Sequence, residues 1–469
     1  MAQLAFIKWA LMFSLTLALS SSSFLLPHHL SYLIDHQQIT SEQLAQAKLL
    51  KLPAYYHFQR RHHQVGSSPW LKASQVLAIK NAAIASQIAA IYDDFGQYQR
   101  ATFWYQQAIK LNATEVRIAL ADLFTKQQRY QQALNTLLPI VNTNQQATIK
   151  ATKLMIALGR PNDIESLLSM LTSFPAGATL VNQLNTYSIL NDSPTLEAKP
   201  SQQDEMLTCI ANIQMFASSL DDLDYLASLI AEFERHPLGP YLCFDPIRYL
   251  SIKNIDCYHR NQNMIRCNDS MWLPLINSIT TTYIGLMLPN GGANVNAGIM
   301  YLDRHDSKDV FAHEVAHLLG FVDEYPLPEN HAKCAQQQAQ PFAHNVAVLK
   351  RLHRGEKRQL RNQILVQIPW RALIDDNTPI MTFDKNNNAW QLGTPIAFEQ
   401  EVGLFISDTC QVFAIDSRTK PIDFTSFKPM KNHTQLTYFE LDFPELYRQI
   451  FKTNKSMFLM PSAKHTLSY

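Results

Sequence analysis

Cysteine is absent from the first 208 residues of this 469-residue chain, so no N-terminal cysteine can carry a lipid anchor. Charged residues make up only 17% of the chain, the formal net charge is +1, and no long block of Lys or Arg occurs. These absences argue against nucleic acid or an anionic membrane surface as a partner. The sequence also lacks a Gly-x-Ser-x-Gly stretch, so a serine nucleophile on a strand-to-helix turn has no support.

A short apolar run lies near the N-terminus. It extends from Trp9 to Leu19, directly after Lys8, and is followed by serines. The run is too short for a comfortable membrane span, and the small side chains of Ala18 and Ser20 fit a signal-peptidase site. We predict a signal peptide over residues 1–23 and an exported protein, periplasmic or secreted, with an uncleaved anchor as the alternative. No later segment of the sequence is long and apolar enough to span a bilayer.

All six cysteines lie in the C-terminal part of the chain. An even number fits an exported protein with three disulfides, and six cysteines allow fifteen pairings. The close spacing of Cys257 and Cys267 predicts a bridge that closes the polar loop between them. The pairing of the other four stays open: Cys209, Cys243, Cys334 and Cys410. Zinc binding by thiols is disfavoured because the spacings do not match a zinc knuckle, and buried free thiols are the remaining alternative.

The length of the chain exceeds what one hydrophobic core usually supports, so we expect two domains. Residues 24–195 are predicted to be helical and residues 206–469 to be mixed α/β, with a polar, proline-containing linker at 196–205. In the helical part, small and aromatic residues recur at the offsets of a tetratricopeptide repeat: Ala89, Tyr92, Ala101, Tyr105 and Ala108, then Ala121, Phe124, Ala133 and Leu137. We predict an all-α, tetratricopeptide-like domain that docks a protein partner or substrate. An unspecific helical bundle is the alternative.

Periodicity predicts the elements of the C-terminal part. Strands are expected over 208–217, 248–252, 280–288 and 298–302, and a helix over 220–233. Asp306 and Ser307 form an N-cap region, which predicts that the next helix begins there. The strand just before that helix is expected to be a sheet edge that can pair with an extended peptide.

The sequence HEVAHLLGFVDEY, which begins at His313, contains the candidate metal ligands and the candidate catalytic residue. On a helix, His313 and His317 stand one turn apart on the same face, and two imidazoles at that spacing can bind one Zn²⁺. Glu314 then lies beside the metal, where it can take a proton from bound water. Gly320 can end the helix in a left-handed turn, which lets Asp323 supply a third ligand. Two histidines and a carboxylate leave the fourth position to water, as in catalytic zinc sites.

The series His-Glu-x-x-His-x-x-Gly-x-x-Asp resembles the metzincin class of zinc peptidases. Further blocks are similar to the bacterial IgA-peptidase type of metallopeptidase: Asn290–Ala293, Gly298–Asp303, Ile368–Trp370 and Glu401–Phe405. The resemblance covers about residues 205–430 and implies an α/β, metzincin-like zinc peptidase domain acting on a peptide or protein substrate. It implies that His313, His317 and Asp323 bind one catalytic Zn²⁺ and that Glu314 is the catalytic residue. It also implies a methionine turn beneath the metal, for which Met381 is the candidate.

Several assignments near the motif stay open. Glu324 adjoins Asp323 and is the alternative third ligand, although we expect it to support the helix by hydrogen bonds. Tyr325 is expected to be structural packing, and three flanking histidines are expected at the surface: His305, His331 and His344. The tyrosine that many metzincins place after the methionine turn is missing, because no Tyr occurs between Tyr325 and Tyr438. The alternatives to a peptidase are a scaffold with a non-catalytic zinc site and a hydrolase of cell-wall peptide amides.

Overall fold

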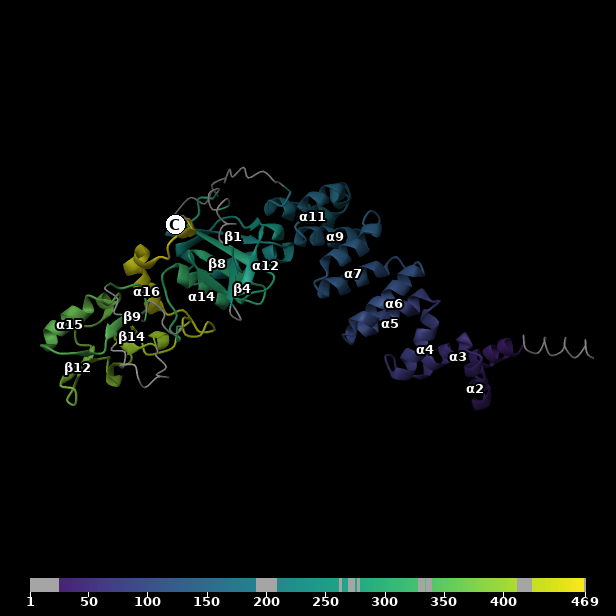
Figure 1. Cartoon of the computed structure of the whole chain (residues 1–469), viewed down its shortest axis with the longest axis horizontal. Coiled ribbons are helices and arrows are strands. Elements are labelled where there is room, and N and C mark those ends of the chain that lie inside the picture. Colours follow the sequence, from purple (N-terminus) through teal and green to yellow (C-terminus); the bar gives the residue numbers. More distant parts are fainter. Residues whose placement is uncertain are drawn as a thin grey trace, which may run out of the picture. The chain divides into compact units, whose positions relative to one another are not determined.

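The computed structural model describes residues 25–190, 209–260, 264–268, 275, 279–327, 334, 340–410 and 424–467. A run of helices comes first and a mixed α/β region with sheets follows, which confirms the predicted fold class (Figure 1). The chain divides into two compact units. The first comprises residues up to Met155 with Ile164–Ala178, and the second comprises Ile156–Asp163 with Thr179–Tyr469. The predicted signal peptide over 1–23 and the predicted linker over 196–205 lie outside the described residues.

Short helices form the first part of the chain: α2 (Ser41–Leu49), α3 (Pro53–His62), α4 (Ser68–Ala78), α5 (Ala82–Asp94), α6 (Tyr98–Lys110), α7 (Val116–Lys126), α8 (Tyr130–Leu137), α9 (Gln145–Ala157), α10 (Leu168–Thr172) and α11 (Pro175–Thr186). Neighbours pack as pairs, α3 on α4, α5 on α6 and α7 on α8. All nine residues at the predicted repeat offsets are buried, so small side chains do lie where paired helices approach. Within the described ranges, no helix combines the length and apolar character needed to cross a bilayer.

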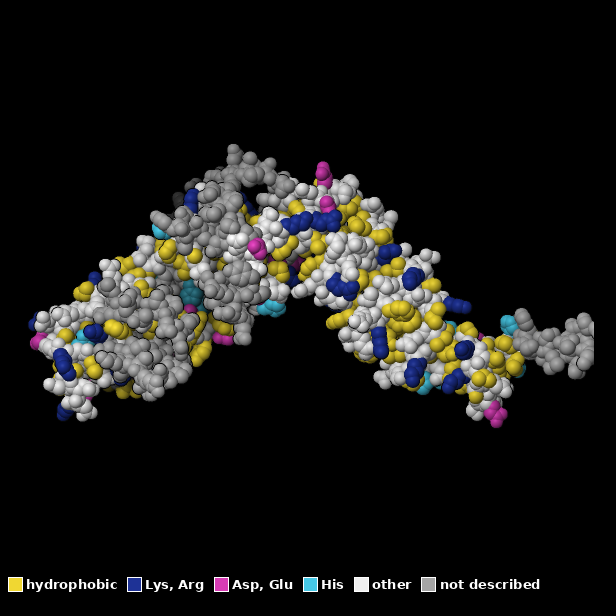
Figure 2. Space-filling view, in the orientation of Figure 1, with side chains coloured by type: hydrophobic (Ala, Val, Ile, Leu, Met, Phe, Trp, Pro, Cys, Tyr) yellow, Lys and Arg dark blue, Asp and Glu magenta, His cyan; other side chains and the backbone are white. Residues whose placement is uncertain are grey.

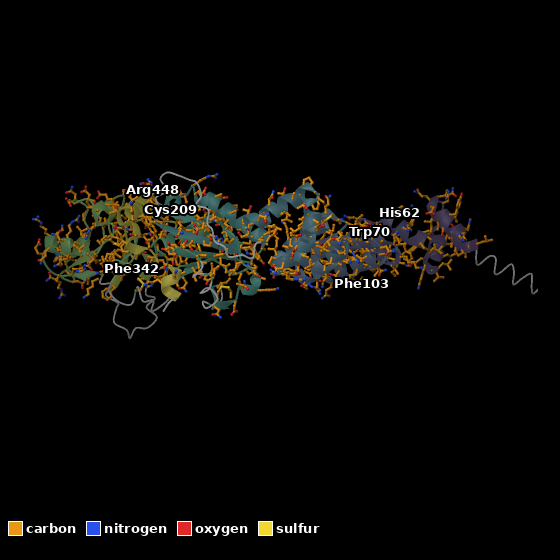
Figure 3. All side chains as sticks on the ribbon, turned by 90° about the horizontal axis from the view of Figure 1, so that it is seen from above. His62, Trp70, Phe103, Cys209, Phe342 and Arg448 are labelled. Atoms are coloured by element: carbon orange, nitrogen blue, oxygen red, sulfur yellow. A yellow bond between two sulfur atoms is a disulfide. The ribbon has the colours of Figure 1, made fainter. Side chains whose placement is uncertain are left out.

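The first unit is basic, although the whole chain is nearly neutral. Its described residues, 25–155 and 164–178, contain 13 Lys and Arg but only 7 Asp and Glu. Lys and Arg side chains are spread along this unit on the face shown in Figure 2. Among its largest buried side chains is Trp70 on α4, which is 2% exposed (Figure 3). The helical unit therefore has an apolar interior and a positively charged exterior.

The main sheet of the second unit has the strand order β2-β1-β6-β8-β7, with β3 (Arg248–Tyr249) paired to β1. β1 (Ala211–Ala217), β6 (Tyr283–Leu288) and β8 (Ile299–Asp303) are parallel and almost wholly buried. β2 (Leu242–Phe244) joins them in parallel, and β7 (Asn294–Asn296) is antiparallel. Central parallel strands are covered on both faces, which explains why their sequences are so apolar.

The expectation about the sheet edge was wrong. β8 is the strand just before the histidine-bearing helix, but it lies between β6 and β7, so β7 is the edge strand at that end of the described sheet. The chain reverses between β7 and β8 at Ala297 and Gly298, which both have positive φ. This two-residue turn adds a short antiparallel strand that periodicity alone did not reveal.

Two helices of the second unit match their predicted positions. α12 (Leu220–Phe233) has the predicted bounds, and the Ser219 side chain caps it by accepting a hydrogen bond from Asp222 N. α14 (Lys308–Leu318) begins after Ser307, as predicted from the N-cap region. The two helices pack against each other and against strands of the main sheet, α12 on β1 and β6 and α14 on β7 and β8.

Smaller sheets and three disulfides complete the second unit. The sheets are β10 (Leu352–His353)–β12 (Ala389–Leu392)–β11 (Met381–Asp384), β13 (Phe405–Ile406)–β14 (Phe424–Lys428)–β9 (Ala347–Lys350), and the hairpin β4 (Cys257–Arg260)–β5 (Met264–Cys267). The disulfides are Cys209–Cys243, Cys257–Cys267 and Cys334–Cys410. The predicted Cys257–Cys267 bridge is confirmed, and it joins directly paired residues of the hairpin. Three disulfides are typical of proteins that fold in an oxidising compartment.

Residues before the predicted linker take part in the second unit. Tyr187 donates a hydrogen bond of 2.8 Å to the Asp224 carboxylate on α12, and Gln183 donates another of 3.2 Å. The backbone N–H of Tyr249 on β3 donates to Tyr187 O, and its hydroxyl donates to Ile156 O. The second unit therefore begins well before residue 205.

This boundary predicts the stability of truncated chains. A fragment that begins at residue 156 should be more stable than one that begins at residue 205, because the shorter fragment loses both hydrogen bonds to Asp224. We expect a difference of at least about 2 kcal/mol, since a hydrogen bond to a charged group contributes about 1.5–3 kcal/mol. Urea unfolding of both fragments, purified under oxidising conditions, measures it. Equal unfolding free energies would contradict this boundary.

Candidate metal centre

The turn after α14 brings the candidate ligands together. α14 ends at Leu318, and Gly320 has a φ of +94°, which L side chains rarely adopt. A Cβ at Gly320 would also lie 2.2 Å from the backbone oxygen of Phe458, so a larger residue does not fit. The chain therefore turns sharply at this glycine and passes back beside the helix. This return places Asp323 against the two histidines of α14.

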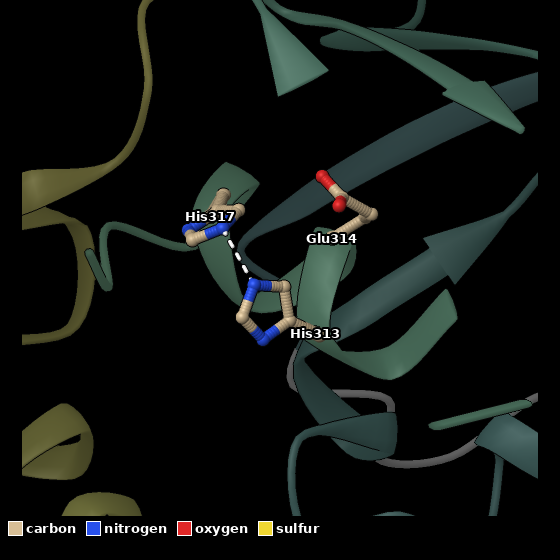
Figure 4. A group of neighbouring side chains, drawn as sticks. All are labelled: His313, Glu314 and His317. Carbon is tan, nitrogen blue, oxygen red and sulfur yellow. Dashed lines mark hydrogen bonds between the residues drawn. The ribbon is translucent and has the colours of Figure 1, made fainter. Parts of the chain in front are cut away.

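Three donor atoms form a nearly equilateral triangle. His313 Nε2, His317 Nε2 and Asp323 Oδ1 lie 3.1 Å from one another. His313 is buried, and the side chains of His317 and Asp323 are 15% and 17% exposed. Figure 4 shows the two imidazoles facing each other with the Glu314 carboxylate beside them. His313, Glu314 and His317 form a group that could hold a metal ion, with ligand atoms within 4.8 Å of one another.

Backbone carbonyls determine which imidazole nitrogens face the triangle. His313 Nδ1 donates to Gln435 O at 2.9 Å, and His317 Nδ1 donates to Phe321 O at 3.2 Å. A carbonyl oxygen can only accept, so each Nδ1 carries a hydrogen and each neutral ring keeps its lone pair on Nε2. Two lone pairs and a carboxylate oxygen at this distance need a shared proton or a bound cation between them. Such Nδ1–H···O=C bonds are the usual support of metal-binding histidines.

The donor set fits a divalent metal. Ligands about 2.0–2.1 Å from a tetrahedral Zn²⁺ are separated by roughly 3.3–3.4 Å. The observed separation of 3.1 Å is close to this value. Two imidazole nitrogens and one carboxylate oxygen are donors that Zn²⁺ accepts. His313, His317 and Asp323 are therefore placed as a ligand set would be.

The charges of the site reflect the same arrangement. Burial lowers the pKa of His317, but the Asp323 carboxylate outweighs this effect and raises it to about 9. Burial raises the pKa of Asp323, and the two imidazoles then bring it far below its usual range. The metal-free site thus holds a proton at neutral pH, which a metal ion would displace. Burial also raises the pKa of Glu314, although both histidines oppose the shift.

Hydrogen bonds from distant segments fix the loop that carries Asp323. Thr409 Oγ1 donates to Asp323 O at 2.8 Å, and Leu327 N donates to Thr409 O at 3.0 Å. Val322 N donates to the Asn345 side chain at 3.0 Å, and that side chain donates back to Val322 O at 2.8 Å. The backbone on both sides of Asp323 is thus held by parts of the chain that follow it in sequence.

Glu324 points away from the imidazoles into a buried polar network. Its side chain is fully buried and forms an ion pair of 2.9 Å with Lys428 Nζ. Four further side chains donate hydrogen bonds to its carboxylate: Asn345, Thr434, Thr437 and Tyr447. In this structure Asp323, and not Glu324, approaches His313 and His317. The role of Glu324 as a supporting residue remains a prediction, and its contacts are those that such a role requires.

Sequence reasoning missed Gln435. This residue lies 122 positions after His313, and its backbone carbonyl orients the His313 ring. Its side chain accepts a hydrogen bond of 3.0 Å from His236 Nε2 and donates one of 3.4 Å to Asp309 O. No local pattern in the sequence marks Gln435, because its contribution comes from a backbone atom placed by tertiary structure.

Tyr325 lies beside the triangle and is not a core residue. It is 42% exposed, and its ring is nearly parallel to that of His313 at a centroid distance of 6.4 Å. Partial burial of the Tyr325 side chain, together with a hydrogen bond to Asp323, raises the pKa of its hydroxyl. The expectation that Tyr325 is structural packing is therefore incomplete. Its hydroxyl lies next to Asp323, a candidate ligand.

The flanking histidines differ from one another. His305 has an 81% exposed side chain, as expected, and His331 lies outside the described residues. The expectation that His344 is a surface residue was wrong, because it is fully buried. Its Nε2 donates to Leu319 O at 3.1 Å, and its ring contacts Phe321 and other aromatic rings. Burial lowers the pKa of His344 to about 3, so this residue is a neutral packing element.

Met381 is the first residue of β11 and is 3% exposed. It pairs with Leu392 of β12 in the antiparallel register. Its burial fits the proposed methionine turn and equally fits an ordinary core residue. The placement of Met381 beneath the imidazoles stays a prediction.

Comparison with known proteins found no relatives: no family model, curated protein or solved structure matches the chain. The assignment of the site therefore depends on the motif residues and their geometry. The buried His-Glu-His group on α14 is the part of the resemblance that the structure supports.

The network around Glu324 yields a stability prediction. Glu324→Gln removes the negative charge and leaves the Lys428 ammonium, whose side chain is 5% exposed, without its ion-pair partner. We expect the free energy of unfolding to fall by about 3–5 kcal/mol, as when one partner of a buried ion pair is removed. Glu445→Gln is the matched control, because Glu445 pairs with Arg448 at the surface. Guanidinium unfolding of both variants tests this, and similar losses would refute the role of the buried network.

Proposed function

We propose that the chain is an exported, zinc-dependent peptidase of the metzincin kind, similar to the bacterial IgA-peptidase type. His313, His317 and Asp323 would hold one Zn²⁺, and Glu314 would act as the general base. The helical unit would dock a substrate or partner. The observation that carries the proposal is the triangle of donor atoms with 3.1 Å sides, next to the buried Glu314 carboxylate.

Glu314 would be the proton acceptor of the proposed reaction. When bound, Zn²⁺ would lower the pKa of a coordinated water to about 7 and polarise the scissile carbonyl. The Glu314 carboxylate lies beside the donor atoms in a buried position. It would take a proton from the attacking water and pass it to the leaving amine.

The edge strand β7 offers a place for an extended substrate. Its backbone could pair with a peptide strand because, among the described strands, β8 alone pairs with it. The Asp303 carboxylate fixes the turn before β7 by accepting hydrogen bonds of 2.8 Å from Gly291 N and Gly292 N. This contact joins two blocks of the family resemblance, Asn290–Ala293 and Gly298–Asp303. Both blocks would thus position the edge strand that binds the substrate.

Tyr325 would supply the hydroxyl that the missing tyrosine after the methionine turn provides in many metzincins. Its ring is partly exposed beside His313, and its hydroxyl bonds to Asp323. A rotation of this side chain would let the hydroxyl donate to the developing oxyanion of the substrate. Such a donor stabilises the charge that forms in the transition state.

Metal content tests the ligand assignment. Purified protein should contain about one zinc, and a chelator should remove both metal and peptidase activity. Asp323→Ala should lose the metal, whereas Glu324→Ala should keep it in the fraction that folds, because the Glu324 carboxylate faces a different network. Elemental analysis of the folded protein gives the ratio of zinc to chain. Loss of zinc from Glu324→Ala but not from Asp323→Ala would show that the third ligand is misassigned.

Substitution of Glu314 tests the mechanism. Glu314→Gln preserves the shape of the side chain but cannot accept the proton, so kcat should fall by at least about 10²-fold. Zinc content and Tm should barely change, because the two imidazoles and Asp323 remain. Asp376→Asn, at an exposed position, is a matched control for loss of one carboxylate. Unchanged activity in Glu314→Gln would disprove the hydrolase assignment, and loss of zinc would make Glu314 a ligand instead.

A further inference from the structure

The helical unit contains a cavity that the metal centre does not explain. Its volume is about 500 Å³. Its walls come from the helical segment over 25–35 and from α3, α4 and α5, and they are formed by Asp35, Ala54, His57, Arg60, Arg61, Trp70 and Gln87. All of these residues belong to the first unit. The volume lies within the range of about 300–1,000 Å³ typical of ligand sites.

Arg60 is held in place with a hydrogen-bond donor unused. Its guanidinium carbon lies 4.9 Å from the ring centroid of Trp70, and its Nη2 donates to Gln87 Oε1. Its Nε is buried and has no hydrogen-bond partner among the described residues. Buried donors without an acceptor are rare in folded proteins. The contacts with Trp70 and Gln87 thus hold the guanidinium at the wall of the cavity.

The charges around the cavity favour an anion. Asp35 is the acidic residue of its wall, and it lies 3.9 Å from Arg61, with both side chains more than half exposed. Burial and the two neighbouring arginines lower the pKa of His57, which is therefore a neutral ring near pH 7 and can donate or accept a hydrogen bond. The surrounding unit also has a clear excess of Lys and Arg over Asp and Glu.

We infer that this cavity binds a peptide through a carboxylate, with Arg60 as the anchor and Arg61 as the second cation. Arg60, Arg61 and Asp35 together leave one net positive charge, which matches a carboxylate better than the roughly two charges of a phosphate monoester. A planar guanidinium also pairs with a carboxylate in a two-point geometry. The cavity is larger than a carboxylate alone, so the Trp70 and Ala54 walls would contact an adjoining apolar side chain.

This inference specifies the docking role proposed above but does not require the metal centre. Failure of the two proposals is distinguishable, because zinc removal would abolish hydrolysis and leave binding to the cavity unchanged. The same independence allows the binding test to be made in the Glu314→Gln background, in which a probe peptide is not cleaved.

The test is calorimetric titration of the full chain carrying Glu314→Gln. The probes are an acetylated Ala-Ser-Ala-Leu peptide with a free C-terminal carboxylate, the same peptide amidated, an amidated peptide with an internal Glu, and inorganic phosphate. We expect binding of a carboxylate-bearing peptide and none of the fully amidated one. Binding of the free C-terminus or of the internal Glu supports the inference and identifies the source of the carboxylate. Equal affinity for the free and amidated peptides, or preference for phosphate, overturns it.

Variants locate the binding site. Arg60→Gln should weaken the preferred peptide at least about tenfold, as expected for the loss of a charge-assisted hydrogen bond. Arg61→Gln, at a 56% exposed side chain, should weaken it without affecting the fold. The control is Arg100→Gln, because Arg100 lies over the Tyr92 ring of the same unit at 5.6 Å but does not line the cavity. Unchanged affinity in Arg61→Gln and Arg60→Gln, or an equal loss in Arg100→Gln, overturns the inference.

Discussion

The close approach of three donor atoms is the arrangement around which the C-terminal unit is organised. His313 Nε2, His317 Nε2 and Asp323 Oδ1 lie 3.1 Å apart, and none of them can relax away without breaking a bond elsewhere. The imidazoles cannot rotate, because each Nδ1–H is bonded to a backbone carbonyl. Asp323 cannot withdraw, because Thr409 holds its backbone. The protein thus holds the three donors together, with a proton on the His317–Asp323 pair that a bound cation would displace.

The stability needed to hold this arrangement comes from a second, buried charge pair. Glu324 directly follows Asp323, and its carboxylate ties the turn to Lys428, to the 434–437 segment and to Tyr447 on α16 (Glu445–Asn454). Buried ion pairs are costly to desolvate, and only full hydrogen bonding offsets that cost. Here every oxygen of the carboxylate has partners. Asp323 therefore completes the donor triangle, and the adjacent Glu324 anchors the loop to the rest of the unit.

The sequence predicted those features that local rules determine. The bounds of α12, the cap at Ser307, the turn at Gly320 and the Cys257–Cys267 bridge each follow from a few neighbouring residues, and the structure contains all of them. It could not predict that β7 forms the sheet edge, that His344 is buried, or that Gln435 orients His313. Each of these depends on contacts between residues far apart in sequence, for which one sequence carries no local signal. The ligand triangle lies between these cases, because its members are close in sequence but distant segments fix their geometry.

The same contacts indicate how metal binding relates to folding. In small zinc domains the metal supplies most of the folding energy, because the ligands are disordered without it. Here the ligand-bearing loop is fixed by Thr409, Asn345 and the Glu324 network, none of which needs a metal. The site is therefore preformed, and an incoming ion would have to displace a proton from the His317–Asp323 pair rather than order the chain. A preformed site of this kind suits catalysis, because little of the binding energy is spent on reorganisation.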